Sequence, residues 1–173
     1  MVHLVRQNKK ENLKIYHREV KKIRKVVGSS VPIDHVGSTC LPNMYGKNII
    51  DILIGAKDLL EMNKITKDII DLGYYPGKNR GDIYRFFAST EEETKSGDVH
   101  IHLAIIGSDR YQDFLILKKY LLEHSNERKA YSDLKRELTK KGVTEREDYK
   151  KTKSEYVSSL LDRARAYAEK KKA

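Results

Sequence analysis

Residues 33–55 read IDHVGSTCLPNMYGKNIIDILIG, a turn of small residues followed by an apolar run that contains a single carboxylate. The β-branched residues at 48–54 predict a central strand. Side chains alternate along a strand, so Asp51 shares a face with Ile49 and Leu53. An ionised carboxylate among apolar residues is costly unless a cation, a metal ion or several donors accompany it. Asp51 is therefore either one half of a salt bridge or a metal-binding carboxylate.

The turn before this strand is Gly37-Ser38-Thr39. A flexible backbone with free N–H groups and two hydroxyls suits a phosphate group. Ser and Thr are also common in ordinary tight turns and at helix N-caps. The Gly-Lys-Ser/Thr ending of a Walker loop is absent, so the turn is not a P-loop.

A second group of titratable residues lies on a later strand, predicted over residues 98–106. Alternation places Asp98, His100 and His102 on one face, where they could hold a metal ion, transfer protons or bind phosphate. A solvated outer face is the alternative. The pattern also resembles the His-x-His-x-His strand of histidine-triad nucleotide hydrolases, with Asp98 in place of the first His.

Four residues of the C-terminal third are candidates for phosphate binding: Lys118, Lys135, Tyr149 and Lys153. Lys135 lies at the edge of an apolar helical stripe, and Lys153 follows Tyr149 by four residues on one helix face. Such lysines either extend along the apolar surface toward water or project into a phosphate cleft.

Hydrophobic periodicity predicts helices at 8–27, 58–72, 109–124, 126–141 and 145–171, and strands at 31–36, 48–54, 83–89 and 98–106. This order is not a regular β-α-β alternation. It predicts an α+β fold with a small mixed or antiparallel sheet and flanking helices. No linker divides the chain, so residues 1–173 are expected to form one domain. Its sheet-containing core would span 1–107, and the helices of 108–173 would dock on that core.

Composition limits the function classes. The one cysteine excludes an internal disulfide and a cysteine-based zinc site. No apolar run approaches the roughly 20 residues that cross a bilayer, and no signal-peptide core follows the N-terminus, so a cytoplasmic protein without a membrane partner is expected. A net charge of +10 favours a phosphate-bearing partner, with nucleic acid as one option. Nothing indicates the oligomeric state.

The segment HVGSTCLPNMYGKNIIDILIG at 35–55 resembles the signature of the GrpB-like family. The resemblance continues through DVHIHLAI at 98–105, LKKYLLEHSNERKAYSDLKREL at 117–138 and the pair Tyr149 and Lys153. It covers most of the chain in the expected order. The sequence departs from the family pattern in a few places: Leu41, Asn43, Asn48, Lys118 and Ser125.

The resemblance implies the nucleotidyltransferase superfold typified by DNA polymerase beta. Gly37, Ser38 and Thr39 would then form the phosphate turn, and Asp51 would be the first metal carboxylate for Mg²⁺ or Mn²⁺. Transferases of this type usually carry a second acid two residues later, where this chain has Leu53.

Three hypotheses follow. In the first, a nucleotidyltransferase holds its metal ion with Asp51, Asp98 and His100, with Asp51, His100 and His102 as catalytic residues. Its phosphate cations are Lys47, Arg85, Lys118, Lys135 and Lys153. In the second, the same cleft binds a nucleotide or another phosphorylated small molecule without turnover. In the third, the histidines serve a phosphoesterase.

Overall fold

The computed structural model describes residues 4–90, 98–140 and 146–171. The helices are α1 (Lys9–Val27), a short 3-10 helix η1 (Ser38–Cys40), α2 (Leu59–Asp71), α3 (Asp109–Glu123), α4 (Ser125–Lys140) and α5 (Arg146–Lys170). The strands are β1 (Val5–Arg6), β2 (Ile33–Val36), β3 (Tyr45–Gly46), β4 (Ile50–Ala56), β5 (Tyr75–Arg80), β6 (Tyr84–Ala88) and β7 (Val99–Ile105).

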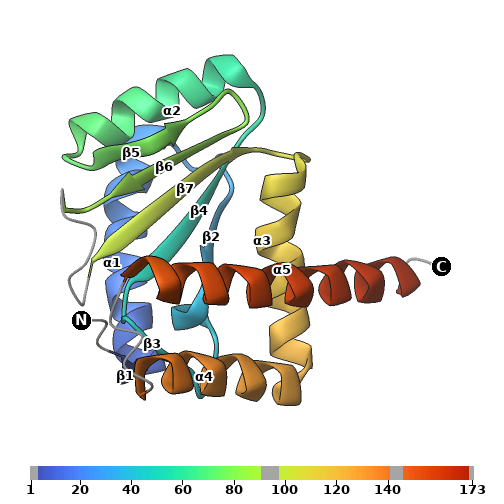
Figure 1. Ribbon diagram of the computed structural model, residues 1–173. Coiled ribbons are helices and arrows are strands. Elements are labelled where there is room, and N and C mark those ends of the chain that lie inside the picture. Colours follow the sequence, from blue (N-terminus) through green and yellow to red (C-terminus); the bar gives the residue numbers. More distant parts are fainter. Residues whose placement is uncertain (1–3, 91–97, 141–145, 172–173) are drawn as a thin grey trace.

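Five strands form the main sheet, in the order β2-β4-β7-β6-β5 (Figure 1). Only the central pair β4–β7 is parallel, and the other pairs are antiparallel. The predicted α+β class with a mixed sheet is confirmed. Strands β1 and β3 form a separate two-stranded sheet.

Helix boundaries follow the capping residues. The Asn8 side chain accepts hydrogen bonds from the backbone N–H groups of Lys10 and Glu11 at the start of α1. Asp58 does the same for Glu61 at the start of α2. Such caps satisfy N–H groups that have no partner within the helix. The predicted helices agree with the observed ones to within one or two residues where the chain is described; the predicted ends at 141 and 145 lie outside the described residues.

The sequence prediction missed β5, whose residues read YPGKNR. Pro76 and Gly77 are typical of turns, and a proline is excluded from most central strands. Strand β5 is at the edge of the sheet, where it pairs with β6 alone. An edge strand tolerates a residue that cannot donate a backbone hydrogen bond.

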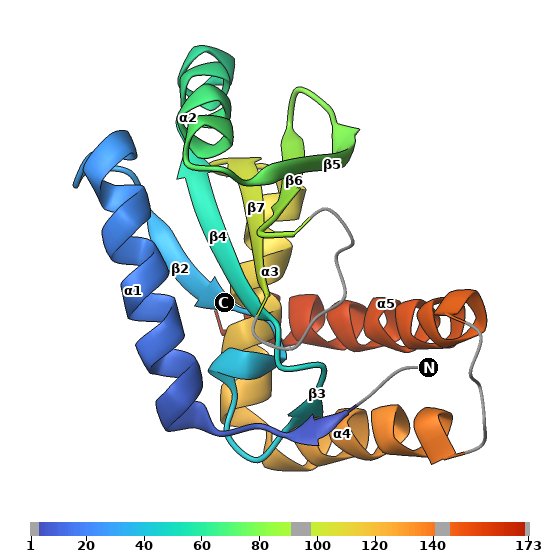
Figure 2. The ribbon, with the colours of Figure 1, turned by 90° about the vertical axis from the view of Figure 1, so that its left-hand side faces the viewer.

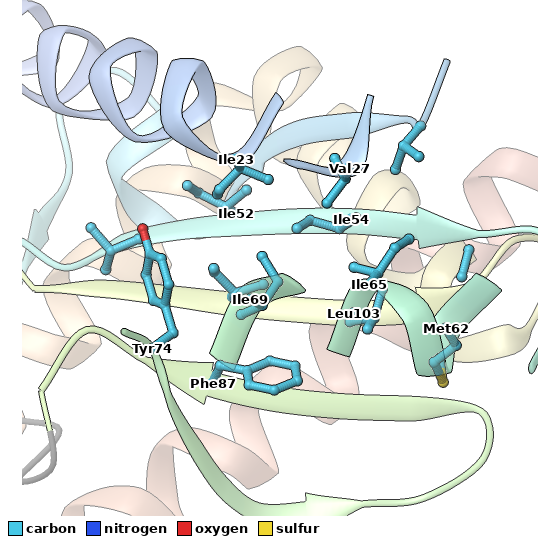
Figure 3. Close-up of a cluster of buried hydrophobic side chains, with 14 of the residues drawn as sticks. Ile23, Val27, Ile52, Ile54, Met62, Ile65, Ile69, Tyr74, Phe87 and Leu103 are labelled. Atoms are coloured by element: carbon cyan, nitrogen blue, oxygen red, sulfur yellow. The ribbon is translucent and has the colours of Figure 1, made fainter. Parts of the chain in front are cut away.

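Helices cover both faces of the sheet: α1 and α2 lie on one side, and α3 and α5 lie on the other (Figure 2). The core beneath α1 and α2 contains alternate residues of the central strands, including Ile52, Ile54 and Leu103 (Figure 3). On the opposite face, Leu53 and Ala104 pack against Tyr111 of α3. A third cluster joins Leu41 and Met44 to the C-terminal helices. Asp51 and the histidines of β7 lie on the same face as Leu53, toward the C-terminal helices.

No helix in the described part of the chain is long and apolar enough to cross a membrane.

Candidate functional site

Asp51 and two histidines meet at the centre of the sheet. In the parallel β4–β7 pair, Asp51 is the register partner of His100, and Leu53 is the partner of His102. The Asp51 Oδ1 atom lies 3.2 Å from His102 Nε2 and 3.6 Å from His100 Nδ1. The Asp51 side chain keeps 23% of its surface exposed, so the carboxylate is accessible from solvent. The prediction that both histidines lie on one face is thus confirmed, and that face also holds Asp51.

Two opposing effects set the pKa values of Asp51 and His102: burial, and the interaction between the carboxylate and the imidazoles. Burial raises the pKa of the Asp51 carboxyl, but the imidazoles of His100 and His102 outweigh it and hold that pKa well below its usual range. Burial lowers the pKa of His102, although Asp51 opposes the shift. At neutral pH the carboxylate is therefore ionised and the His102 imidazole is neutral.

A hydrogen-bonded chain extends this pair to β6. Because the ionised Asp51 can only accept, the neutral His102 donates through Nε2 and must accept at Nδ1. The Tyr84 hydroxyl lies 2.7 Å from that Nδ1 and is the donor. The guanidinium of Arg110 lies 4.8 Å from the centre of the Tyr84 ring. Tyr84 and His102 thereby fix the orientation of Oδ1, and no hydrogen bond from the described residues reaches Asp51 Oδ2.

The Gly37 turn packs directly against the other carboxylate oxygen. Gly37 has φ +72° and ψ −169°, a conformation nearly restricted to glycine. A Cβ atom at this position would lie 2.1 Å from Asp51 Oδ2. The turn can approach the carboxylate only because it has no side chain there. Gly37 and Asp51, 14 residues apart in the sequence, therefore belong to one site.

The two hydroxyls of the turn have different surroundings. Ser38 Oγ accepts a 3.3 Å hydrogen bond from the Gln7 side-chain amide. Thr39 is fully buried, and its Oγ1 lies 3.0 Å from His35 Nε2. Burial lowers the pKa of His35 to about 4, so its ring is neutral. The prediction that the Thr39 side chain binds phosphate is wrong, because its hydroxyl is enclosed in the protein interior.

The C-terminal helices bring lysines toward this site. Lys135 of α4 is 3% exposed, and its ammonium lies 4.6 Å from the centre of the Tyr131 ring. No carboxylate among the described residues forms a salt bridge with it. Burial and the positive charge of Lys153 lower the pKa of Lys135 to about 7, against the effect of Asp51. The Lys135 ammonium is therefore within electrostatic range of Lys153 on one side and of Asp51 on the other.

The structure places Arg85 elsewhere. Its guanidinium donates to Thr66 Oγ1 and Asn63 Oδ1 of α2, at 2.8 Å each. Arg85 is the register partner of Leu103, whose side chain belongs to the core beneath α1 and α2. The prediction that Arg85 neutralises phosphates beside Asp51 is wrong, because strand alternation directs it to the opposite face of the sheet.

The predicted metal set of Asp51, Asp98 and His100 does not assemble. Asp98 is buried, and its Oδ2 accepts a 3.0 Å hydrogen bond from Thr90. Within residues 4–90, 98–140 and 146–171, no three His, Cys, Asp or Glu side chains are arranged to hold a metal ion. A site in which Asp51 Oδ2 supplies one ligand and a bound phosphate supplies others still fits Mg²⁺, which commonly keeps few protein ligands.

Three predicted residues remain. Lys118 of α3 forms a 3.4 Å salt bridge with Asp34 of β2. Lys47 is half-buried in the connection between β3 and β4. Tyr149 lies in α5, but its side chain is outside the described residues. Sequence reasoning missed Tyr84, although strand alternation places it on the same face as Phe86, the register partner of His102.

Relatives of the chain are found by sequence. The model of the GrpB protein family matches residues 2–163. A UPF0157 protein of Halalkalibacterium halodurans is 28% identical over 154 residues, which is 88% of this chain and 77% of the relative. The glutamate-rich protein GrpB of Alkalihalophilus pseudofirmus is 27% identical over 163 residues, or 88% of this chain and 90% of that protein.

Solved structures extend the comparison to the fold. The crystal structure of the conserved protein GrpB from Enterococcus faecalis superimposes with a TM-score of 0.80 at 18% identity, covering 94% of this chain and 96% of that chain. A structure of Cid1, described as having RNA terminal uridylyl transferase activity, gives a TM-score of 0.52 at 11% identity over 78% of this chain and 41% of that chain. The chain therefore belongs to the GrpB family, and its α+β fold is shared with GrpB from Enterococcus faecalis and with part of Cid1.

Proposed function

We propose that this protein binds a nucleoside triphosphate with Mg²⁺ at the Gly37 turn and Asp51, and transfers the nucleotidyl group to an acceptor. The observation that carries the proposal is the contact between the turn and the carboxylate. A Cβ at Gly37 would fall 2.1 Å from Asp51 Oδ2. Free backbone N–H groups and a metal-binding carboxylate are the two parts that a phosphate site of this type needs side by side.

Each part of the site has a role. Asp51 Oδ2 would hold Mg²⁺, which when bound would neutralise the charge of the phosphates. His102 and Tyr84 keep the carboxylate in one orientation through Oδ1. The backbone of Gly37 and Ser38 would donate to the phosphates. Lys135 and Lys153 would supply positive charge from the helical side, so catalysis would rest on positioning and electrostatics.

A specific observation favours binding without turnover as the second candidate. Leu53 occupies the position of the usual second acid, is 1% exposed and packs with Ala104 and Tyr111. A two-metal mechanism needs carboxylates that stabilise both the attacking and the leaving oxygen. At position 53 this chain instead has a buried leucine packed against apolar side chains. This supports the second candidate, a module that binds a nucleotide or another phosphorylated small molecule without turnover.

Under the phosphoesterase hypothesis, one of the two histidines remains able to act on a phosphate ester. Both ring nitrogens of His102 are engaged, by Asp51 and by Tyr84. His100 Nε2 is buried and has no hydrogen-bond partner among the described residues. Any histidine that attacks or protonates a phosphate ester at this site would therefore be His100.

Calorimetric titration with ATP, CTP, GTP and UTP, with Mg²⁺ or with a chelator, tests the proposal together with an assay for released pyrophosphate. We expect Mg²⁺-dependent binding and pyrophosphate release, both lost in Asp51→Asn. Asp162→Asn is the matched control, since Asp162 is 72% exposed on α5. Binding that survives chelation without pyrophosphate would support the second candidate. Hydrolysis lost in His100→Ala but retained in Asp51→Asn would support the phosphoesterase. If no nucleotide binds, the proposal is wrong.

A further inference from the structure

The outer face of α1 carries a row of exposed basic residues. Its members are spaced four, four, three and four positions apart: Lys10, Lys14, Arg18, Lys21 and Lys25. At about 100° per residue, this spacing keeps all five within roughly one quarter of the helix circumference. The residues that α1 buries, Asn12, Glu19, Ile23 and Val27, lie on the opposite side. We call the five residues the α1 basic row.

The row is long and straight. Lys25 follows Lys10 by 15 positions, which corresponds to about 22 Å along a helix. Lys14 is paired with Glu11 at 2.9 Å, and Arg18 with Glu19 at 2.9 Å. No acidic side chain among the described residues forms a salt bridge with Lys10, Lys21 or Lys25. A solvated helix face usually mixes charges of both signs, whereas every position of this row is basic.

The surroundings of the row favour one kind of partner. A helix that lies on a membrane needs large apolar side chains beside its basic ones. On α1, Val26 is the one apolar residue among the exposed large hydrophobic residues, at 37% exposure. A linear array of cations without apolar anchors fits a linear array of phosphates, and ammonium groups bind phosphates through charge rather than through base identity.

We propose that α1 binds the phosphate backbone of a single-stranded nucleic acid along the α1 basic row. Helix α1 lies on one side of the sheet (Figure 2) and packs against Ile52 and Ile54, whereas Asp51 is on the other face of β4. The first member of the row is close in sequence to Gln7, whose amide contacts Ser38 of the phosphate turn. A strand bound along α1 would therefore extend toward the turn at the N-terminal end of the helix. Binding itself requires nothing of the nucleotide site, so it stands if the proposed transferase activity fails.

Fluorescence anisotropy with a labelled single-stranded RNA of mixed sequence tests the proposal on the full chain. The test variant is Lys10→Gln/Lys21→Gln/Lys25→Gln. The matched control is Lys57→Gln/Lys64→Gln/Lys67→Gln, which removes the same charge from exposed lysines at or near α2. Circular dichroism shows whether each variant is folded.

We expect the α1 variant to weaken binding at least tenfold. Its plot of log affinity against log salt should be shallower by about 2, since each neutralised phosphate of a single strand contributes about 0.7. The α2 variant should bind within about twofold of the parent chain. Equal losses in both variants would mean non-specific attraction by net charge and would overturn the proposal. So would a parent chain that does not bind RNA, or one that binds only anionic phospholipid vesicles.

Discussion

At the scale of single residues, the site depends on two groups in unusual surroundings. Gly37 has a backbone conformation that other residues avoid, and it contacts Asp51. Lys135 is a lysine with almost no exposed surface and no carboxylate partner among the described residues. Burying an unpaired cation destabilises a protein, so a chain that retains one gains something else from it.

Gly37→Ala should lower the free energy of unfolding by about 3 kcal/mol and abolish Mg²⁺-dependent nucleotide binding, since it combines a disfavoured backbone conformation with a clash against Asp51. Gly73→Ala is the control: Gly73 also has a positive φ, +91°, but no atom lies within 4 Å of the position that a Cβ would take there. It should lose only about 1 kcal/mol and keep binding. Urea unfolding and calorimetry measure both. Equal losses of stability in the two variants would contradict the contact with Asp51.

Lys135→Met should raise stability at neutral pH and weaken ligand binding. The folded pKa of Lys135 is about 7, below its ordinary value of 10.5, so the unfolded chain binds more protons between these values. Stability of the parent chain should therefore rise with pH, by about 2 kcal/mol from pH 7 to pH 9, and this rise should be absent in the variant. Urea unfolding at both pH values measures it. Lys129→Met is the control, because Lys129 is 77% exposed on the same helix. This variant keeps Lys135, so its stability should rise with pH as in the parent chain. A Lys135→Met variant that is less stable than its parent at pH 7 would refute the lowered pKa of Lys135.

At the scale of elements, α5 is attached to the protein in two ways. Leu160 and Ala164 are fully buried against residues of α3, α4 and the loop after η1. At the surface, Arg165 makes bidentate contact with Asp113 of α3. Because apolar burial usually outweighs exposed ion pairs, the buried side should determine whether α5 stays docked.

Leu160→Ala should cost about 2–4 kcal/mol and also weaken nucleotide binding, since α5 carries Lys153. Arg165→Ala should cost less than about 1 kcal/mol, because the pair is partly exposed, and it should leave binding unchanged. Thermal unfolding and calorimetric titration give both quantities. Comparable losses of stability in the two variants would show that the surface pair has the larger share in docking α5.

At the scale of the whole molecule, the sheet has apolar side chains on both faces and needs helices on both. The face beneath α1 and α2 is covered by the N-terminal half of the chain (Figure 3). The other face depends on Tyr111 of α3, which covers Leu53 and Ala104. The C-terminal helices are thus part of the fold as well as one wall of the site.

A chain ending at Gly107 should not fold cooperatively, because Leu53 and Ala104 would face water. We expect secondary structure by far-ultraviolet circular dichroism, strong binding of a hydrophobic dye and a broad thermal transition. The intact chain provides the comparison. A sharp transition with dispersed amide resonances in the truncated chain would show instead that residues 1–107 form an independent domain.

Sequence patterns predicted those features that depend on local periodicity. Alternation on β4 and β7 predicted that Asp51, His100 and His102 lie on the opposite face from the core residues between them. Capping residues and glycines predicted where the helices begin and end. The same patterns failed at β5, where local turn residues lie in an edge strand, and at Arg85, for which the face of the sheet had not been assigned.

The sequence by itself determined the α+β class, the turn and which residues of one strand share a face, because these follow from neighbours along the chain. Only the tertiary structure decided which residues meet. The parallel pairing of β4 with β7 brings both histidines to one oxygen of Asp51, and the return of the chain after η1 brings Gly37 to the other. It also buried Thr39 and Lys135, directed Arg85 to α2 and paired the buried Asp98 with Thr90. Contacts between distant segments depend on strand order and helix docking, which no local pattern encodes.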